Sequence, residues 1–159
     1  MMTNYSNMSE VIWQSKAFEE LSTKELYEIL ALRTEVFVVE QNCIFQDMDF
    51  KDDVAIHILG KSSEGKLLAY SRIFDKDLYY SGYLAIGRVV TKASNRKGGL
   101  GIELLEQSIK TCYAMYGVLP IKIGAQKYLT RFYSKFGFKE IGEDYIEDGI
   151  PHCIMIKEE

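Results

Sequence analysis

The stretch Ile86-Gly-Arg-Val-Val-Thr-Lys-Ala-Ser-Asn-Arg-Lys-Gly-Gly-Leu-Gly101 runs from an apolar segment into a loop rich in glycine and basic residues. The candidate binding residues follow one another in the chain: Arg96, Lys97, Gly98, Gly99, Leu100 and Gly101. Glycines let backbone N–H groups converge without Cβ clashes, and a helix that begins here adds partial positive charge. The stretch therefore indicates a cradle for a diphosphate, with two basic side chains available to pair with its charge.

Three phosphate-binding patterns can be compared with this loop. A P-loop requires G-x-x-x-x-G-K-[ST], a string that the sequence does not contain. A dinucleotide fingerprint that starts at Gly99 would have Leu104 in place of its third glycine, and Pro120 where an acidic residue is expected. The third pattern, Arg/Gln-x-x-Gly-x-Gly, is matched from Arg96 to Gly101. An ordinary glycine-rich turn is the alternative.

Apolar residues on both sides of this loop recur at spacings that predict helices and strands. Helices are predicted at 23–38, 101–116 and 128–136, and strands at 54–60, 66–74, 84–91, 120–125, 138–145 and 152–157. Ser22 and Glu25 have the spacing of a capping box at the start of the first helix. Residues 40–53, rich in aspartate and aromatic side chains, are predicted to form an irregular loop. This order predicts a mixed α/β fold around a central sheet.

Length and composition predict one folded domain. The chain has 159 residues, of which 47% are hydrophobic and 26% are charged. These values exclude the disordered, collagen-like and low-complexity classes. We expect residues 1–10 to form a loose N-terminal lead-in and residues 11–159 to form the single domain.

Charge and hydropathy narrow the range of partners. With 19 Lys and Arg against 23 Asp and Glu, the formal net charge is −4, whereas nucleic-acid binding usually needs a basic surplus. No apolar run approaches the roughly 18 residues of a transmembrane helix, and the N-terminus lacks the basic and apolar regions of a secretory signal. We therefore expect neither nucleic acid nor a membrane as a partner, and a cytoplasmic location.

The cysteine pattern bears on metals and on the redox environment. Cys43, Cys112 and Cys153 form no Cys-x-x-Cys pair, and the chain has 2 histidines. Because zinc sites use closely spaced sets of these residue types, no metal site is predicted. Free thiols in a reducing compartment are the expected state.

A second motif, Phe132-Tyr-Ser-Lys-Phe-Gly-Phe138, places Tyr133 one turn before a helix-ending glycine. Two interpretations stay open for this tyrosine. It can be a core aromatic, as tyrosines on apolar helix faces often are. It can also be a proton donor, since a phenol with an ordinary pKa near ~10 suits the protonation of a departing thiolate.

These motifs resemble those of the GCN5-related N-acetyltransferase (GNAT) superfamily, and more closely those of its ElaA-like branch. The superfamily resemblance covers 84–138. The branch resemblance extends over most of the chain and includes Val36-Phe-Val-Val-Glu-Gln41 and Glu147-Asp-Gly-Ile-Pro-His152. It implies a single-domain fold with a central, mostly antiparallel, splayed sheet flanked by helices. In one departure, Lys97 follows Arg96 where the family commonly has glycine.

The resemblance also implies an activity. It is that of an acetyl-CoA-dependent N-acetyltransferase, which moves an acetyl group to the primary amine of an acceptor by direct transfer in a ternary complex. Backbone N–H groups around Val89 and Val90 would bind the cofactor and polarise the thioester carbonyl. The amides from Arg96 to Gly101 would hold the diphosphate, and Gln126 would contact the cofactor through its side chain. The acceptor, a small-molecule or peptide amine, is not identified.

Acyl transfer to an amine makes two proton demands. Tyr133 is the predicted general acid, which protonates the leaving thiolate. For the base that neutralises the amine, the candidates are Glu40, His57 and His152. Each of these three also has a structural interpretation: a helix-end cap for the glutamate and a buried, hydrogen-bonded residue for either histidine.

Acidic residues collect in the predicted loop and near the C-terminal turn: Asp47, Asp49, Asp52, Asp53, Glu147 and Asp148. They can attract a cationic amine, or they can simply keep a loop solvated. Arg33, Arg72 and Arg88 lie within apolar stretches, so some of them should pair with these carboxylates if they are buried. Arg33 and Arg88 could instead bind a carboxylate of the substrate.

Other functions compete with the transferase. A non-catalytic acyl-CoA-binding or sensing module is the main alternative. A route through an acylated cysteine has less support, because no basic residue adjacent in sequence marks Cys43, Cys112 or Cys153 as an activated thiolate. Pairing of two copies into a homodimer, through an exposed sheet edge or an apolar patch, is left open by the sequence.

Overall fold

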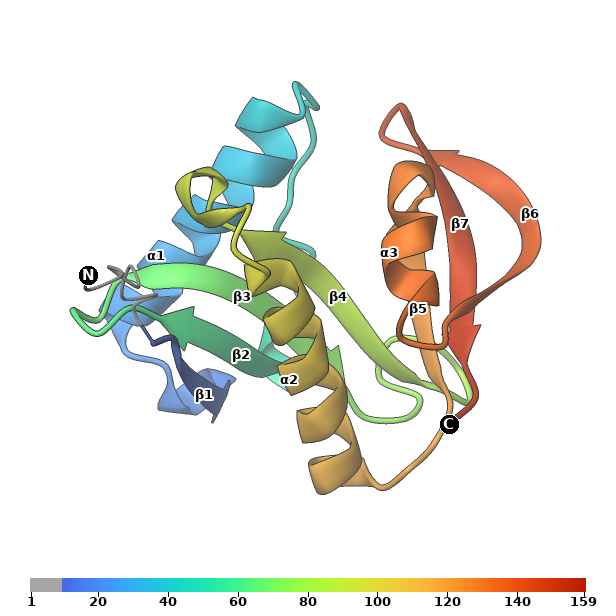
Figure 1. Cartoon of the computed structure of the whole chain (residues 1–159), viewed down its shortest axis with the longest axis horizontal. Helices are drawn as coiled ribbons and strands as arrows, with labels where there is room; N and C mark the ends of the chain where they lie inside the picture. Colours follow the sequence, from blue (N-terminus) through green and yellow to red (C-terminus); the bar gives the residue numbers. More distant parts are fainter. Residues whose placement is uncertain (1–9) are drawn as a thin grey trace, which may run out of the picture.

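The computed structural model describes residues 10–159, which form one seven-stranded sheet with helices on both faces (Figure 1). The strands are β1 (Ile12–Ala17), β2 (Ile56–Lys61), β3 (Leu67–Phe74), β4 (Leu84–Thr91), β5 (Ile121–Gln126), β6 (Lys139–Glu147) and β7 (Ile150–Lys157). The helices are α1 (Thr23–Arg33), α2 (Leu100–Tyr116) and α3 (Thr130–Ser134). The predicted lead-in lies outside the described residues, except for residue 10.

The order of the strands is β1-β2-β3-β4-β5-β7-β6, and every neighbouring pair is antiparallel except β4 and β5. The connection between these two parallel strands runs through α2, as a parallel pair requires. Within residues 10–159, β4 and β5 pair only at Leu84–Ile121 and Ala85–Lys122. Beyond these pairs the strands diverge, as Figure 1 shows. The predicted mixed α/β fold with a splayed, mostly antiparallel sheet is confirmed.

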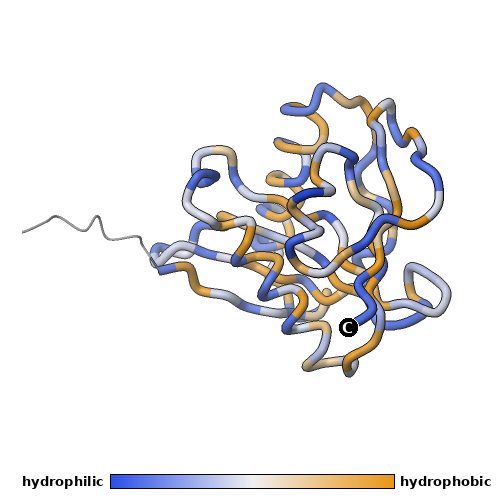
Figure 2. The backbone as a smooth tube through the Cα atoms, turned by 45° about the vertical axis from the view of Figure 1, so that its right-hand side comes forward, coloured by the Kyte–Doolittle hydropathy of each residue, from blue (hydrophilic) through white to orange (hydrophobic). Residues whose placement is uncertain are grey.

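Alternation along the strands sends side chains to two separate layers. In β2, Ile58 packs in the cluster that contains the buried residues of α2, whereas Leu59 packs in the cluster that contains those of α1. Along the chain in Figure 2, apolar and polar segments alternate at short intervals, as expected for elements with one buried face. The two helices therefore cover opposite faces of the same half of the sheet.

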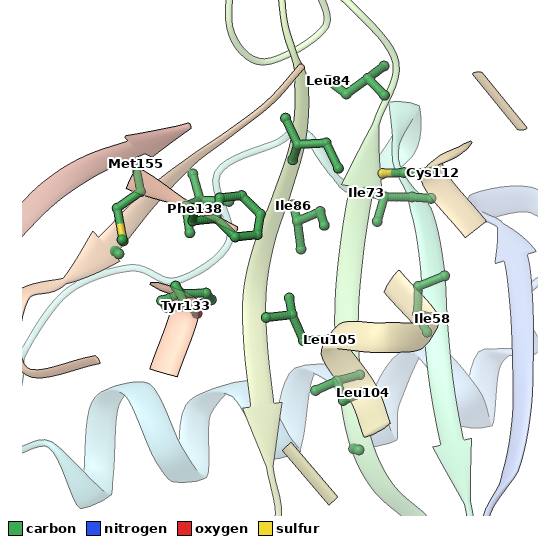
Figure 3. Close-up of a cluster of buried hydrophobic side chains, with 14 of the residues drawn as sticks. Ile58, Ile73, Leu84, Ile86, Leu104, Leu105, Cys112, Tyr133, Phe138 and Met155 are labelled. Carbon is green, nitrogen blue, oxygen red and sulfur yellow. The ribbon is translucent and has the colours of Figure 1, made fainter. Parts of the chain in front are cut away.

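The larger core cluster extends across the two halves of the splayed sheet. Figure 3 shows Tyr133, Phe138 and Met155 on one side of β4, and Leu104 and Leu105 of α2 on the other. Tyr133 is 7% exposed and the other four are at most 1% exposed. Packing at the base of the split thus holds the two halves in a fixed relation.

Most predicted elements appear within a few residues of their expected bounds. Ser22 accepts from the backbone N–H of Glu25 at 3.0 Å, and the Glu25 carboxylate accepts from the Ser22 N–H at 2.9 Å, so the capping box is confirmed. The predicted helix 23–38 ends as a regular helix at Arg33 and continues as wide π turns over Thr34–Glu40. Strand β1 was not predicted. No helix within residues 10–159 is long and apolar enough to cross a membrane.

Candidate functional site

The split between β4 and β5 opens into a cavity of about 860 Å³. Its walls come from the glycine-rich loop, from β4 and β5, from α3, from the loop after α1 and from the β6–β7 turn. The predicted site residues that line it are Glu40, Val89, Val90, Arg96, Lys97, Gly99, Leu100, Gly101, Gln126, Tyr133 and His152. Two predicted residues do not line it: Gly98 borders a separate, smaller depression formed by residues 93–98, and His57 is buried in β2.

The N-terminus of α2 faces this cavity without a side-chain cap. Gly99, the residue before the helix, has φ +78° and no side-chain hydrogen bond caps the helix there. The N–H of Glu103 donates to the Gly99 carbonyl at 3.1 Å, which is the i to i−4 bond at the start of the helix. The N–H groups of residues 100–102 lie before this bond, so the helix offers them no carbonyl acceptor. Their donors and the helix dipole leave a position suited to an anion.

Arg96 is held by a forked ion pair with Glu40. Its two terminal nitrogens donate to the two carboxylate oxygens at 2.6 and 2.7 Å, and one also donates to the Thr91 carbonyl at 3.2 Å. The hydrogen bond from Arg96 lowers the pKa of the Glu40 carboxyl from its ordinary value, against a small opposing effect of burial. The contact ties the end of the first helical segment to the glycine-rich loop, 56 residues away.

Strand β4 carries a bulge beside the cavity. Tyr70 of β3 faces Val90, but Arg72 faces Gly87, so two residues of β4 lie opposite one residue of β3. Arg88, inside the bulge, has φ +50°. A bulge interrupts the regular ladder and redirects backbone groups. Since β5 has already diverged from β4 here, the edge that includes Val89 and Val90 borders the cavity.

The side chain of Gln126, at the end of β5, is paired with that of Gln41. The amide nitrogen of Gln41 donates to the Gln126 oxygen at 3.3 Å, and the reverse bond is 3.2 Å. Because Gln41 follows the π turns and Gln126 belongs to β5, the amide pair joins the two halves across the split.

Tyr133 lies on α3 and is almost completely buried, yet it lines the cavity. Its ring makes edge-to-face contacts with Phe132 and Phe138, with centroids 5.2 and 6.0 Å apart. Burial raises the pKa of its phenol well above the ordinary value. The hydroxyl therefore stays protonated at neutral pH, as a proton donor requires.

The tautomer of His152, in β7, is fixed by a hydrogen bond from its Nδ1 to a backbone carbonyl. Nδ1 lies 2.7 Å from the Ile150 carbonyl, which can only accept, so Nδ1 carries a proton. In the neutral ring Nε2 then has a lone pair, and it lies 3.6 Å from a carboxylate oxygen of Glu147. The ring stacks on Tyr145 at 5.6 Å between centroids.

His57, the other candidate histidine, is fully buried in β2 and both of its ring nitrogens are occupied. Nδ1 lies 2.7 Å from the Tyr70 hydroxyl, and Nε2 lies 2.8 Å from the Asp52 carbonyl. Burial lowers the pKa of this imidazole from its ordinary value. Of the three base candidates, the structure brings Glu40 and His152 to the cavity and keeps His57 away from it.

The sequence is similar to those of known proteins. The family profile described as acetyltransferase (GNAT) domain matches residues 38–159. Protein ElaA of Escherichia coli is 41% identical over 148 residues, which cover 92% of this chain and 95% of ElaA. The chain belongs to the GNAT acetyltransferase family. Within that family it is ElaA-like, as the resemblance of the sequence predicted.

Solved structures agree with this assignment. The crystal structure of an acyl-CoA N-acyltransferase from Pseudomonas aeruginosa superposes with a TM-score of 0.88 at 39% identity, covering 93% of this chain and 99% of that one. The crystal structure of E. coli ElaA gives a TM-score of 0.86 at 40% identity and covers 94% and 100%. The GNAT fold and family make this chain an acyltransferase that uses acyl-CoA.

A network of buried and half-buried charged residues adjoins the cavity of this GNAT domain: Arg33, Arg72, Arg88, Asp47, Asp49 and Asp52. Asp49, Arg72 and Arg88 also line the cavity. Asp47 accepts from the Nε of Arg33 at 2.6 Å and from the Nε of Arg88 at 2.7 Å. Asp52 accepts from Arg33 at 2.7 Å and from Arg72 at 2.9 Å. The predicted pairing of the apolar-stretch arginines with the acidic loop is confirmed. The network fixes the loop after α1 against β3 and β4.

Several residues of the site were not predicted. They include Gln41, Tyr79, Tyr80 and Tyr145, all of which line the cavity. The aspartate and aromatic content of residues 40–53 indicated an irregular loop there, although not which of its residues would line a cavity. The aromatic residues of 79–80 and 145 come from separate elements, and a single sequence gives no sign that they meet.

Proposed function

We propose that this protein is an acetyl-CoA-dependent N-acetyltransferase that transfers an acetyl group to a primary amine by direct attack in a ternary complex. One observation carries the proposal: the uncapped N-terminus of α2, the bulge of β4 and the phenol of Tyr133 border the same cavity. Together they supply a site for a diphosphate, donors for a carbonyl oxygen and an acid for a thiolate.

The residues at the end of the cavity near α2 fit the cofactor. The backbone amides from Arg96 to Gly101 would hold the diphosphate, with Lys97 as a further cation. A side chain at Gly99, where φ is +78°, would force strained backbone into the cradle. When bound, acetyl-CoA supplies a thioester whose carbonyl carbon accepts the amine and whose sulfur leaves as a thiolate.

Residues of β4 and β5 would align the reacting atoms. Backbone N–H groups around Val89 and Val90 would donate to the thioester oxygen as it gains negative charge, and preorganised donors of this kind are a large contribution to catalysis. Gln126 and Gln41 would contact the arm that passes between the two halves of the sheet. Both contacts rely on the divergence of β4 from β5.

Two side chains would move the protons. Nε2 of His152 accepts a proton from the acceptor ammonium, directly or through water, and the carboxylate of Glu147 stabilises the imidazolium that results. Tyr133 gives its phenolic proton to the departing thiolate. Glu40, already held as an anion by Arg96, is better suited to positioning that arginine than to accepting a proton. We assign His57 a role in folding, not in transfer.

The alternatives have less support. A binding module without turnover has no need of a buried phenol and a tautomer-fixed imidazole at one cavity. For the thiol route, burial raises the pKa of Cys112 to about 12 and that of Cys153 to about 11, which disfavours their thiolates. Cys43 lines the cavity, but its thiol donates to the Asp148 carbonyl at 3.1 Å. A cytoplasmic location suits the 3 buried, free cysteines.

Calorimetric titration with acetyl-CoA, followed in the same sample by measurement of free-thiol release with a panel of amines, tests the proposal. We expect binding, and thiol release that depends on the amine. Binding without release by any amine would favour the module instead. Absence of binding would overturn both functions.

A further inference from the structure

The cavity continues onto the face of the sheet that lies opposite α2. In β4, Leu84 and Ile86 pack in the cluster that contains the buried residues of α2 (Figure 3), so the alternate residues Ala85 and Gly87 point to the other face. Both line the cavity, and a Cβ at Gly87 would have no atom of a residue beyond its chain neighbours within 4 Å. Ala85 and Gly87 thus form a floor with open space above it.

Aromatic side chains form a wall beside this floor. Phe74 of β3 lies opposite Ala85 in the ladder, so the two side chains share a face. Tyr79 contacts Phe74 with ring centroids 5.1 Å apart, and Tyr80 contacts Tyr79 at 4.8 Å. The Tyr80 hydroxyl lies 3.2 Å from the position of a Cβ at Gly124, so the wall reaches β5. All three rings line the cavity, and we call the space between them and the floor the aromatic chamber.

Arg88 follows the floor in the chain, and one of its terminal nitrogens is free. Its Nε donates to the Asp47 carboxylate at 2.7 Å and its Nη2 donates to the Asp47 carbonyl at 2.8 Å, whereas Nη1 bonds to none of residues 10–159. Since Asp47 also binds Arg33 of α1, this guanidinium lies on the same face as the floor. The Arg88 side chain is 22% exposed and lines the cavity. By contrast, Arg33 is completely buried, and its Nε and both terminal nitrogens bond within the protein.

The bulge of β4 determines where this guanidinium lies. Arg88 has φ +50°, a conformation that is uncommon for residues other than glycine. Strain of this kind persists where the surroundings impose it, and it collects at functional positions. The next residue, Val89, begins the pair of N–H groups that we propose for the thioester oxygen. The bulge therefore puts a free cationic donor and the proposed carbonyl donors on consecutive residues.

The proposed base lies on the same face, on the other side of the split. In β5, Ala125 packs in the cluster with α2, so Gln126 faces the other way, and His152 lies opposite Gln126 in the ladder. Glu147, whose side chain is 61% exposed, lies 3.6 Å from Nε2 of His152. An ammonium is therefore attracted to His152 and Glu147, while Arg88 offers a site for a negative group.

We infer that the acceptor is a small amine that also carries a carboxylate and an apolar side group, and that Arg88 binds the carboxylate. The inference rests on the proposed function. Guanidinium and carboxylate form short, charge-assisted hydrogen bonds, which are stronger where water is excluded. The apolar group occupies the aromatic chamber, and the amine faces His152. The amine nitrogen bonds to the thioester carbon and the C–S bond breaks, which gives the N-acetylated acid, the CoA thiol and one released proton.

The test compares L-phenylalanine with phenethylamine, which lacks the carboxylate, in the thiol-release assay with acetyl-CoA. We expect the higher kcat/KM for L-phenylalanine. Arg88→Gln should lower kcat/KM for L-phenylalanine about 10- to 100-fold more than for phenethylamine, the effect of one charge-assisted hydrogen bond. Because each amine is its own reference, their difference in basicity cancels. Arg131→Gln, at an exposed arginine of α3 outside the cavity lining, is the matched control and should preserve both values.

Measurements that do not depend on the folding of Arg88→Gln support the same test. In the unaltered protein, 3-phenylpropanoate, which has the ring and the carboxylate but no amine, should inhibit competitively with L-phenylalanine. Its amide, 3-phenylpropanamide, should not inhibit at the same concentration. Gly87→Val, which fills the open space above the floor, should raise the KM for L-phenylalanine. An unchanged KM in Gly87→Val would show that the side group does not occupy the aromatic chamber.

Distinct results would overturn the inference. Equal losses with both amines in Arg88→Gln would show that Arg88 only holds the loop between α1 and β2 in place. Equal inhibition by the acid and its amide, or a kcat/KM for phenethylamine as high as that for L-phenylalanine, would show that no carboxylate is recognised. Thiol release with other amines but not with L-phenylalanine would overturn the inference and leave the proposed transferase intact. Absence of thiol release with any amine would overturn the transferase itself.

Discussion

The guanidinium of Arg96 forks onto the carboxylate of Glu40, with both bonds shorter than 2.8 Å. Arg96 belongs to the loop that we assign to the diphosphate. In the free protein its guanidinium is paired with Glu40, although an anionic ligand would use the same guanidinium. The two side chains are 39% and 40% exposed, and pairs in contact with solvent contribute about 0–1 kcal/mol to stability. The Glu40 carboxylate positions Arg96 in the free protein, and it competes with a bound anion for the same guanidinium.

Glu40→Gln should consequently tighten the binding of acetyl-CoA. Removal of one negative charge beside a bound diphosphate is worth about 1 kcal/mol in a partly exposed site, or roughly a fivefold lower Kd. Titration calorimetry at low salt measures the effect. Glu64→Gln, at an exposed carboxylate in the β2–β3 turn outside the cavity lining, is the control. A weaker Kd in Glu40→Gln would show that the carboxylate supports the cradle instead.

Gly99→Asp should abolish binding of acetyl-CoA. The substitution puts a carboxylate at the N-terminus of α2, where we expect the diphosphate, and at a backbone φ of +78°. Gly65→Asp is a matched control, because Gly65 has φ +84° with open space around it and lies in the β2–β3 turn away from the cavity. Both variants should lose about 1 kcal/mol of stability from backbone strain. Unaltered binding by Gly99→Asp would mean that the cradle lies elsewhere.

The features predicted best from the sequence are those that depend on residues adjacent in the chain. Both bounds of β4 were predicted, because Leu84–Thr91 is nearly all apolar or small and belongs at the centre of a sheet. The diphosphate loop was predicted for the same reason, since its glycines, basic residues and helix start are contiguous. Strand β1 was not predicted. It is an edge strand whose side chains are half-buried or exposed, so its sequence lacks a clear apolar pattern, and it forms a strand because it pairs with β2.

Contacts between distant segments could not be predicted from one sequence. Glu40 reaches Arg96 across 56 residues, and Gln41 reaches Gln126 across 85. His57 illustrates the same limit, since its residue type suits a base. Only the fold reveals that the Tyr70 hydroxyl and the Asp52 carbonyl occupy both of its nitrogens.

Tyr133→Phe should separate binding from chemistry. The variant retains the ring and its contacts with Phe132 and Phe138 and loses only the proton, so the Kd for acetyl-CoA should stay within about twofold. Turnover should fall by about 10²–10⁴, the usual contribution of a general acid. Tyr128→Phe, at a 71% exposed tyrosine that also lines the cavity, is the control. If kcat is unchanged in Tyr133→Phe, the phenol has no part in the transfer.

His57 should make stability depend on pH. Because burial lowers its pKa in the folded state, the unfolded chain binds more protons below the ordinary histidine pKa of ~6.5. Its stabilising contribution is complete above that pH and is lost as the pH falls. Urea unfolding at about pH 7.5 and 5.5 should show a loss of up to about 1.4 kcal/mol at the lower pH from this residue.

The pH experiment has an internal control. His57→Gln should reduce the difference in unfolding free energy between the two pH values, whatever its effect on absolute stability. The carboxylates with lowered pKa, such as Glu25 at about 2, contribute above their unfolded values near 4.5 and lose that contribution only at lower pH. A full pH difference in His57→Gln would assign the dependence to another group.

Asp47→Asn should destabilise the fold strongly, because it removes a partner from two arginines at once. Arg33 is completely buried, and Asp47 bonds to its Nε at 2.6 Å and to the Nε of Arg88 at 2.7 Å. Loss of one partner from a buried ion pair typically costs about 3–5 kcal/mol, since the other charge stays buried. Asp53→Asn, at an exposed aspartate of the same segment, should change the free energy of unfolding by less than about 0.5 kcal/mol. Equal unfolding midpoints for these two variants in urea would show that the network does not hold the loop between α1 and β2 in place.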